Sequence, residues 1–211
     1  MPNTRIAPQV AWNELMEGHR RFRAGKPAHP HQHADYRRSL EAGQDPNVAL
    51  FGCADSRVPP DAIFDRGFGD IFIARNMGQI LHRDITATME FGVSALGVAV
   101  IIILSHSSCG AISAAITSCG PDPVAHSPAI QGELDDIVPA VRGVWGSDGV
   151  VDPGAIDADE VGRRHAVWTM EALIDSSELI SSAIARGPVS YTHLTLPTIL
   201  RSCRSRWSPY H

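Results

Sequence analysis

The sequence predicts a single α/β domain built on a mostly parallel β-sheet flanked by helices. Three short apolar runs, at residues 47–52, 70–76 and 98–104, alternate with helix-like segments. Strands that alternate with helices in this way are typical of a parallel sheet. The length of 211 residues and the hydrophobic fraction of 44% also suit one domain with a substantial core. We therefore divide the chain into one domain at residues 1–188 and a tail at residues 189–211.

The domain is expected to begin with a helical arm at about residues 8–36. Despite Gly18, four apolar side chains recur on roughly one face of a helix over residues 11–24: Trp12, Leu15, Met16 and Phe22. Residues 25–36 contain three histidines among prolines and glycines, which suggests either a metal-binding tract or a solvated connecting loop. We favour the loop for His29, His31 and His33.

The α/β core is expected at about residues 45–188, and its first strand ends at a cysteine. Residues 47–52 form an apolar run that leads into Cys53 and is followed by the turn-forming Pro59-Pro60, as expected of a buried parallel strand. Residues 70–76 supply a second strand. The most hydrophobic run, residues 98–104, leads directly into the segment 105–110, so we place this strand at the centre of the sheet.

Helices are expected between and after these strands. One covers residues 84–96 and another follows Gly110. A polar region with prolines and glycines at residues 120–160 precedes a long helical pattern from about residue 161 to residue 185.

Charge and hydropathy narrow the classes of partner. The formal net charge is -5 and the basic residues are scattered along the chain, so neither a nucleic acid nor a membrane surface is an expected partner. No apolar run approaches the roughly 18 residues that a membrane-spanning helix needs, and the N-terminus lacks the apolar core of a signal peptide. We expect a cytoplasmic protein with a small-molecule substrate.

The tail at residues 189–211 is predicted to be non-native. Val189 to Thr198 can be back-translated as GTC TCT TAT ACA CAT CTG ACG CTG CCG ACG, which is the sequence of a transposase-type sequencing adapter. Arg204 to His211 can be back-translated as its continuation, AGA TCT CGG TGG TCG CCG TAT CAT. We exclude Cys203 and His193 from functional argument for this reason; the alternative is a natural C-terminal extension. Because residues 189–196 alternate like a strand, we also expect them to fill a vacant strand position.

Two cysteine-bearing segments are predicted to meet at one edge of the sheet. Cys53 follows the first strand, and His106 and Cys109 follow the central strand; in open α/β sheets, sites lie beyond the carboxyl ends of the strands. Two thiolates and one imidazole suit tetrahedral zinc and leave its fourth position open, as catalytic zinc requires. Asp55 can orient a water at that position or occupy the position itself, and Arg57 can hold this carboxylate in a bidentate pair.

Together these residues resemble a known family. Cys53-Ala54-Asp55-Ser56-Arg57, followed by His106-Ser107-Ser108-Cys109-Gly110, is similar to the Cys-x-Asp-Ser-Arg and His-x-x-Cys-Gly signatures of β-class carbonic anhydrases. Weaker resemblance extends from Ala11 to about Gly187 and includes Arg75-Asn76-Met77-Gly78. Two departures are Ser105, where the family usually has glycine and where we expect a crowded loop, and the absence of the last one or two native strands after residue 188.

The resemblance implies a zinc-dependent lyase that hydrates carbon dioxide reversibly to bicarbonate and a proton. Cys53, His106 and Cys109 would hold one Zn²⁺ per chain, and Asp55 and Arg57 would be the catalytic residues, with Asp55 a fourth ligand in a closed form only. No other cofactor is implied. The full-length parent would be a homodimer or homotetramer. A zinc hydrolase of an analogue such as carbon disulfide and a non-catalytic zinc-binding module remain alternatives.

Other candidate residues receive no role in this interpretation. Cys119 is read as a buried thiol or a loop residue rather than a ligand. His82 and His165 are read as satisfied polar residues rather than proton shuttles.

Overall fold

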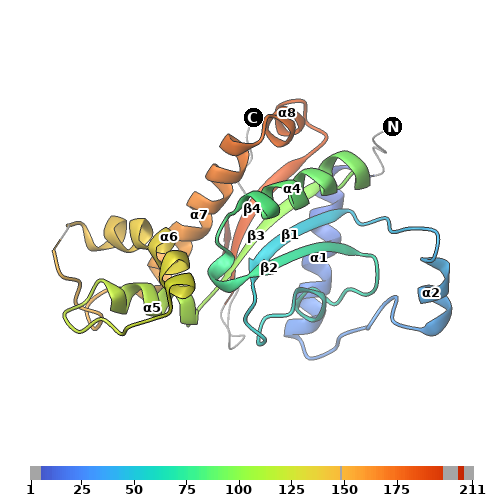
Figure 1. Ribbon diagram of the computed structural model, residues 1–211. Helices are drawn as coiled ribbons and strands as arrows, with labels where there is room; N and C mark the ends of the chain where they lie inside the picture. The colour runs from blue at the N-terminus through green and yellow to red at the C-terminus, as the bar shows by residue number, and fades with distance from the viewer. Residues whose placement is uncertain (1–5, 148, 197–203, 207–211) are drawn as a thin grey trace.

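The computed structural model describes residues 6–147 and 149–196, and the backbone of residues 204–206. Within these residues, a five-stranded sheet has the order β2-β1-β3-β4-β5. Helices cover both of its faces (Figure 1), which confirms the predicted fold class. The strands are β1 (Val48–Cys53), β2 (Ile71–Asn76), β3 (Val100–His106), β4 (Ser190–Leu196) and β5 (Arg204–Arg206).

The first four strands are parallel, and their register aligns the strand ends that carry the candidate ligands. Val48 of β1 lies opposite both Ile71 of β2 and Val100 of β3. The carboxyl ends of β1 and β3 therefore meet at one edge of the sheet, where Cys53 and His106 are the last residues of their strands.

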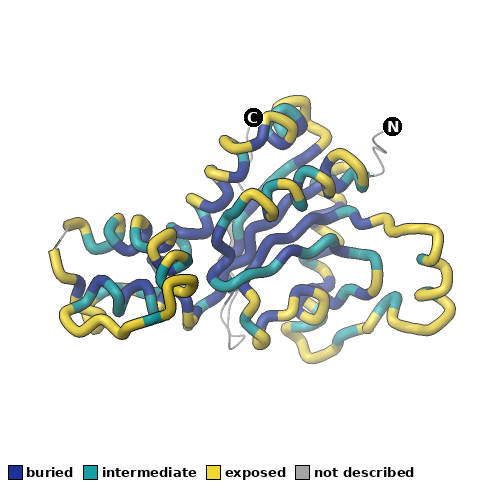
Figure 2. The backbone as a smooth tube through the Cα atoms, in the orientation of Figure 1, coloured by how far each residue is buried: buried dark blue, intermediate teal, exposed yellow. Residues whose placement is uncertain are grey.

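Alternation along the central strands divides the core between the two faces of the sheet. On one face, Leu50 and Ile102 contact α1 (Pro8–Arg23) and the short α3 (Pro60–Ile63). On the other face, Phe51 and Ile103 contact residues of four elements: α4 (Arg83–Phe91), the π-helix η2 (Gly92–Leu96), α7 (Ala158–Ser176) and α8 (Glu178–Ala185). Figure 2 shows the central strands β1 and β3 as continuously buried.

A third cluster forms at the carboxyl edge of the sheet. Helices α5 (Gly110–Ser118) and α6 (Pro128–Trp145) contact one another there and enclose Cys53 and Cys109. We did not predict α6, because its prolines and glycines resemble those of a loop. Ser127 caps its N-terminus by accepting a hydrogen bond from the Ile130 N–H, and Pro128 occupies the first turn, where a missing N–H costs nothing.

The predicted long C-terminal helix is also two helices. The chain breaks between α7 and α8 at Ser177, whose backbone is extended. Its hydroxyl donates to the Glu90 carboxylate at 2.6 Å and accepts from the Ile180 N–H at 3.1 Å. The capping hydroxyl therefore begins a second helix, α8, which covers one end of the sheet.

The N-terminal arm consists of α1, a loop and the short α2 (Ala34–Ser39). Gly18 lets α1 approach the core closely, because an added Cβ would lie 1.8 Å from the Phe64 carbonyl oxygen. The loop is fixed by Asp65, whose side chain is fully buried and accepts from Arg21 and from the backbone N–H groups of residues 28 and 29.

Strand β4 lies beside β3, and all its residues belong to the tail that we predicted to be non-native. Thr192, Leu194 and Leu196 are buried while the residues between them are partly exposed, as the alternation predicted. The position beside β3 that we expected to be vacant is therefore occupied by β4. Cys203 lies outside the described residues.

None of the helices in the described part of the chain combines the length and the apolar character needed to cross a bilayer.

Candidate metal centre

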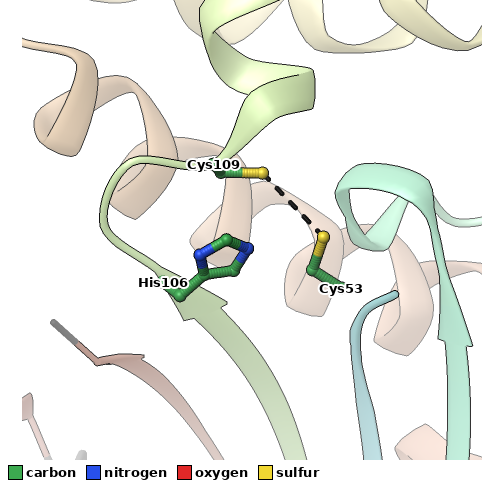
Figure 3. Close-up of side chains that lie close together, drawn as sticks. All are labelled: Cys53, His106 and Cys109. Carbon is green, nitrogen blue, oxygen red and sulfur yellow. Dashed lines mark hydrogen bonds between the residues drawn. The ribbon is translucent and has the colours of Figure 1, made fainter. Parts of the chain in front are cut away.

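Three predicted ligands converge at the carboxyl edge of the sheet (Figure 3). Cys53 ends β1, His106 ends β3, and Cys109 directly precedes α5. One ligand atom from each residue lies within 4.8 Å of the other two, and all three residues are buried. The two sulfur atoms are 3.9 Å apart, a separation that two thiolates on one tetrahedral zinc can adopt with Zn–S bonds of about 2.3 Å.

The hydrogen bonding of His106 leaves one ring nitrogen available to a metal. Its Nδ1 lies 3.0 Å from the Ser107 carbonyl oxygen, and since a carbonyl only accepts, Nδ1 carries the proton. Nε2 is buried and makes no hydrogen bond to a nitrogen or oxygen atom among the described residues; the group that it meets is the Cys53 thiol. An unshared lone pair on a buried nitrogen is costly unless it binds something, so the donor set fits a metal ion.

The Cys53 and Cys109 thiols differ in pKa. The Cys109 thiol lowers the pKa of Cys53 by hydrogen bonding to it, and the His106 ring lowers it further. The bond to Cys53, together with burial, raises the pKa of Cys109. Cys53 is therefore the more acidic of the two thiols, and a cation held by both sulfurs would displace the Cys109 proton as well.

Asp55 and Arg57 form the predicted bidentate pair beside the ligands. The guanidinium donates to both carboxylate oxygens, from Nε at 2.9 Å to Oδ1 and from Nη2 at 2.6 Å to Oδ2. This pair holds the pKa of Asp55 well below its usual range. Arg57 also donates to the Ser108 carbonyl at 3.0 Å, so one side chain joins the two ligand-bearing loops.

The Asp55 carboxylate is close to the three ligands but is not one of their group. Its Oδ2 lies 3.9 Å from His106 Nε2, and the described group of candidate ligand atoms comprises Cys53, His106 and Cys109. The Asp55 carboxylate instead points toward the Arg57 guanidinium, which donates to both of its oxygens.

Arg75 is a site residue to which the sequence analysis gave no role. Its Nε donates to the Cys53 carbonyl at 2.8 Å and its Nη2 donates to the Asp55 carbonyl at 2.6 Å. It thereby fixes the backbone of the loop that carries both side chains. Arg75-Asn76 belongs to the resemblance noted above, which was the available signal, but its carbonyl partners could not be read from the sequence.

The remaining candidates lie outside the ligand group. Cys119 is buried in the same apolar cluster as Cys53 and Cys109 without joining them. His82 bonds Glu133 at 3.0 Å and His165 bonds the Gly78 carbonyl at 3.0 Å, so both are satisfied polar residues. Ser105 is buried and donates weakly to the Gly162 carbonyl at 3.4 Å.

The three loop histidines also lie apart from the metal centre. His31 bonds Asp70 at 2.7 Å and stacks on Tyr36, and His33 accepts a hydrogen bond from the Tyr36 N–H. Among the described residues, they form no group with metal-binding spacing.

Comparison with known proteins gives a consistent result. The carbonic anhydrase family model matches residues 48–195. Carbonic anhydrase 2 of Mycobacterium tuberculosis is 37% identical to this chain over 195 residues, which cover 92% of the chain and 90% of that relative. The carbonic anhydrase of Mycolicibacterium smegmatis is 33% identical over 198 residues, with coverages of 94% and 90%.

Solved structures share the fold. The β-carbonic anhydrase CcaA superposes with a TM-score of 0.65 at 27% identity, over 89% of this chain and 90% of that one. A structure described as one of two tetrameric β-carbonic anhydrases from Sordaria macrospora gives a TM-score of 0.66 at 21% identity, with coverages of 93% and 94%.

Proposed function

The chain belongs to the β-carbonic anhydrase family of enzymes, and from this premise we propose that it catalyses the zinc-dependent, reversible hydration of carbon dioxide to bicarbonate and a proton. The observation that carries the proposal is the convergence of Cys53, His106 and Cys109, with His106 Nε2 buried and bonded to no nitrogen or oxygen atom among the described residues. Two sulfur ligands and one nitrogen ligand favour zinc over the hard cations Mg²⁺ and Ca²⁺, which select oxygen.

The metal would have three protein ligands and one open position. When bound, zinc would act as a Lewis acid that lowers the pKa of a coordinated water toward about 7. The ion pair with Arg57 keeps Asp55 ionised and fixes its orientation, so the carboxylate would be available to accept a hydrogen bond beside the metal. The same pair opposes entry of Asp55 into the metal's coordination sphere, which supports the open form over a closed one.

The apolar surroundings suit an uncharged substrate. Cys53 and Cys109 belong to a buried cluster with Ile80, Ile112 and Val161. A low-dielectric wall strengthens the Asp55–Arg57 interaction and accepts carbon dioxide without a charged anchor. A charged product would be held less well there than carbon dioxide, which favours the release of bicarbonate.

Stopped-flow carbon dioxide hydration on the zinc-loaded chain tests the proposal. Cys53→Ser is expected to lose both bound zinc and activity. Cys119→Ser is the matched control, because Cys119 is a buried free thiol of the same cluster outside the ligand group, and it is expected to keep both. A wild-type chain that binds one zinc but hydrates carbon dioxide only at the background rate would favour a non-catalytic zinc-binding module.

Three further assignments are part of the proposal. We propose a cytoplasmic location, because Cys53 and Cys109 need a reducing compartment to remain free thiols. We propose that the protein forms a homodimer or homotetramer, to be tested by light scattering after size-exclusion chromatography. We propose that residues 189–211 are adapter-encoded; resequencing of the source DNA that gave an uninterrupted natural reading frame through these codons would refute this.

A further inference from the structure

The turn that follows β2 has a backbone that needs external support. Its η1 segment (Met77–Gln79) contains two successive left-handed residues, Gly78 with φ of 72° and Gln79 with φ of 48°. Glycine adopts this region freely, but a glutamine does so at a cost in free energy and persists there only when the surroundings over-determine it. The turn is therefore held by its neighbours rather than by its own preference.

Three side chains hold it. Asn76 bridges the turn from within, donating to the Ile80 carbonyl at 2.7 Å and accepting from the Ile80 N–H at 2.9 Å. From α7, His165 Nε2 donates to the Gly78 carbonyl at 3.0 Å. One helical turn later, the Thr169 hydroxyl donates mainly to the His165 carbonyl at 2.8 Å and makes a weaker contact with the Gln79 carbonyl at 3.4 Å. A buried, neutral His165 suits this role, since burial lowers its pKa.

The other side of the turn faces the metal centre. The Gly78 backbone N–H is among the groups that lower the pKa of the Cys53 thiol. Geometry also joins the turn to the ligand loop, because Cys53 lies opposite Asn76 in the sheet and the Ala54 N–H donates to the Asn76 carbonyl at 2.7 Å. The fit is close, because a Cβ on Gly78 would lie 3.0 Å from Ala111 Cβ and 3.1 Å from Ile137 Cδ1. Gly78 thus lies between a buried histidine on one side and a candidate ligand on the other.

We propose that His165 is a positioning residue for the metal centre, which holds the Gly78 N–H on the Cys53 sulfur through its own bond to the Gly78 carbonyl. The inference rests on the proposed zinc site. Two thiolates cancel the formal charge of Zn²⁺ and weaken it as a Lewis acid; an N–H bonded to one sulfur withdraws electron density from that ligand and leaves the metal more electrophilic. His165 thereby influences how much electron density the Cys53 sulfur donates to the metal, although it lies 87 residues from Gly78 in the chain.

Substitution of Co²⁺ for zinc gives an absorption signal that does not depend on the overall stability of the fold. In the Co²⁺ form, the sulfur-to-metal charge-transfer absorption reports the energy of the thiolate lone pairs. His165→Phe removes the donor and keeps a planar ring, so we expect this absorption to move to longer wavelength. Metal affinity is expected to change by about tenfold or more, a typical effect of residues that orient metal ligands. His165→Gln, which can place an N–H donor near the same carbonyl, is expected to return the absorption toward the wild-type position.

His19→Phe is the matched control. His19 is also buried, and its Nδ1 lies 3.1 Å from the Ile63 carbonyl, but it is on α1 and away from the metal centre. This variant is expected to lose stability without a change in the absorption. Where His165→Phe does not fold, Thr169→Val loosens the same turn and is expected to shift the absorption in the same direction by less.

The outcomes separate the two proposals. A folded His165→Phe chain with the wild-type absorption overturns the positioning role and leaves the zinc site intact, as does an unshifted Thr169→Val chain where His165→Phe does not fold. An equal shift in His19→Phe also overturns the positioning role. A folded wild-type chain that takes up no Co²⁺ at Cys53, His106 and Cys109 counts against the zinc site itself.

Discussion

Replacement of Asp65 by asparagine is expected to destabilise the fold strongly, although the two side chains have nearly the same shape. The Asp65 carboxylate is fully buried and accepts three hydrogen bonds. Oδ2 accepts from Arg21 Nε at 2.6 Å and from the Ala28 N–H at 2.9 Å, and Oδ1 accepts from the His29 N–H at 2.9 Å. These bonds attach α1 and the following loop to the core.

An asparagine has one acceptor oxygen in place of two. If it keeps the Arg21 and Ala28 bonds, its amide NH₂ faces the His29 N–H in this part-buried contact, and two donors meet without an acceptor at a cost of about 1–3 kcal/mol. The Arg21 bond also loses its charged acceptor, which about halves its strength. The sum is about 3 kcal/mol, which for a domain of this size lowers Tm by roughly 6–12 °C.

Thermal unfolding followed by circular dichroism measures this difference. Glu17→Gln is the matched control, because Glu17 also pairs with Arg21, at 3.7 Å, but its side chain is 66% exposed; its loss should cost less than about 0.5 kcal/mol. An Asp65→Asn chain whose Tm equals that of Glu17→Gln would refute the reasoning.

The pH dependence of the same carboxyl provides a second check. Burial alone would raise the pKa of Asp65, but the bonds from Ala28, Arg21 and His29 outweigh it, and the folded pKa lies below the usual value of 3.8. Its contribution is present above the unfolded pKa and is lost as pH falls through the folded pKa. The Asp65→Asn difference in stability should therefore shrink in strong acid.

The remaining predictions concern the site and one surface pair. Arg57→Lys keeps the charge but not the two-pronged contact with Asp55, and we expect kcat/KM for carbon dioxide hydration to fall by roughly ten- to hundredfold with zinc retained; unchanged kinetics would contradict the role of the pair. Arg75→Met removes both carbonyl contacts of the ligand loop and should weaken zinc binding by about tenfold or more in a chelator competition, whereas wild-type affinity would show the contacts to be dispensable. Glu133 raises the pKa of His82 above 6.5, so the pair stabilises the fold below that pH and the stabilisation disappears as pH rises through the folded pKa. Because both side chains are partly exposed, Glu133→Gln should lower stability by less than about 1 kcal/mol at pH 5.5 and by less still at pH 9; equal losses at both pH values would contradict it.

The sequence was sufficient to predict β1, β2, β3 and the strand-like character of β4, though not β5, and to predict which residues meet at the ends of β1 and β3. Residues 48–52 and 98–104 contain no polar side chain, as expected of strands buried on both faces, and parallel register then brings Cys53 and His106 to one edge. Helix α6 was missed although Leu134, Ile137 and Val141 follow a helical period. Pro139 inside that helix and the glycines around it obscured the pattern.

The contacts that support the site could not be predicted from the sequence, for a physical reason. Arg75 and His165 act on backbone carbonyls, which every residue possesses and which therefore leave no trace in residue identity. The break at Ser177 was readable in principle, since a serine that caps Ile180 is a typical start of a helix. It was hidden by apolar residues that continue on both sides.

The most direct test of the account is the exchange of oxygen-18 between labelled carbon dioxide and water, followed by mass spectrometry on the zinc-loaded chain and its Cys53→Ser variant. We predict exchange well above the uncatalysed rate in the wild-type chain, lost on removal of zinc and absent in Cys53→Ser. Exchange at the uncatalysed rate in a folded chain with one zinc held by Cys53, His106 and Cys109 would contradict the account.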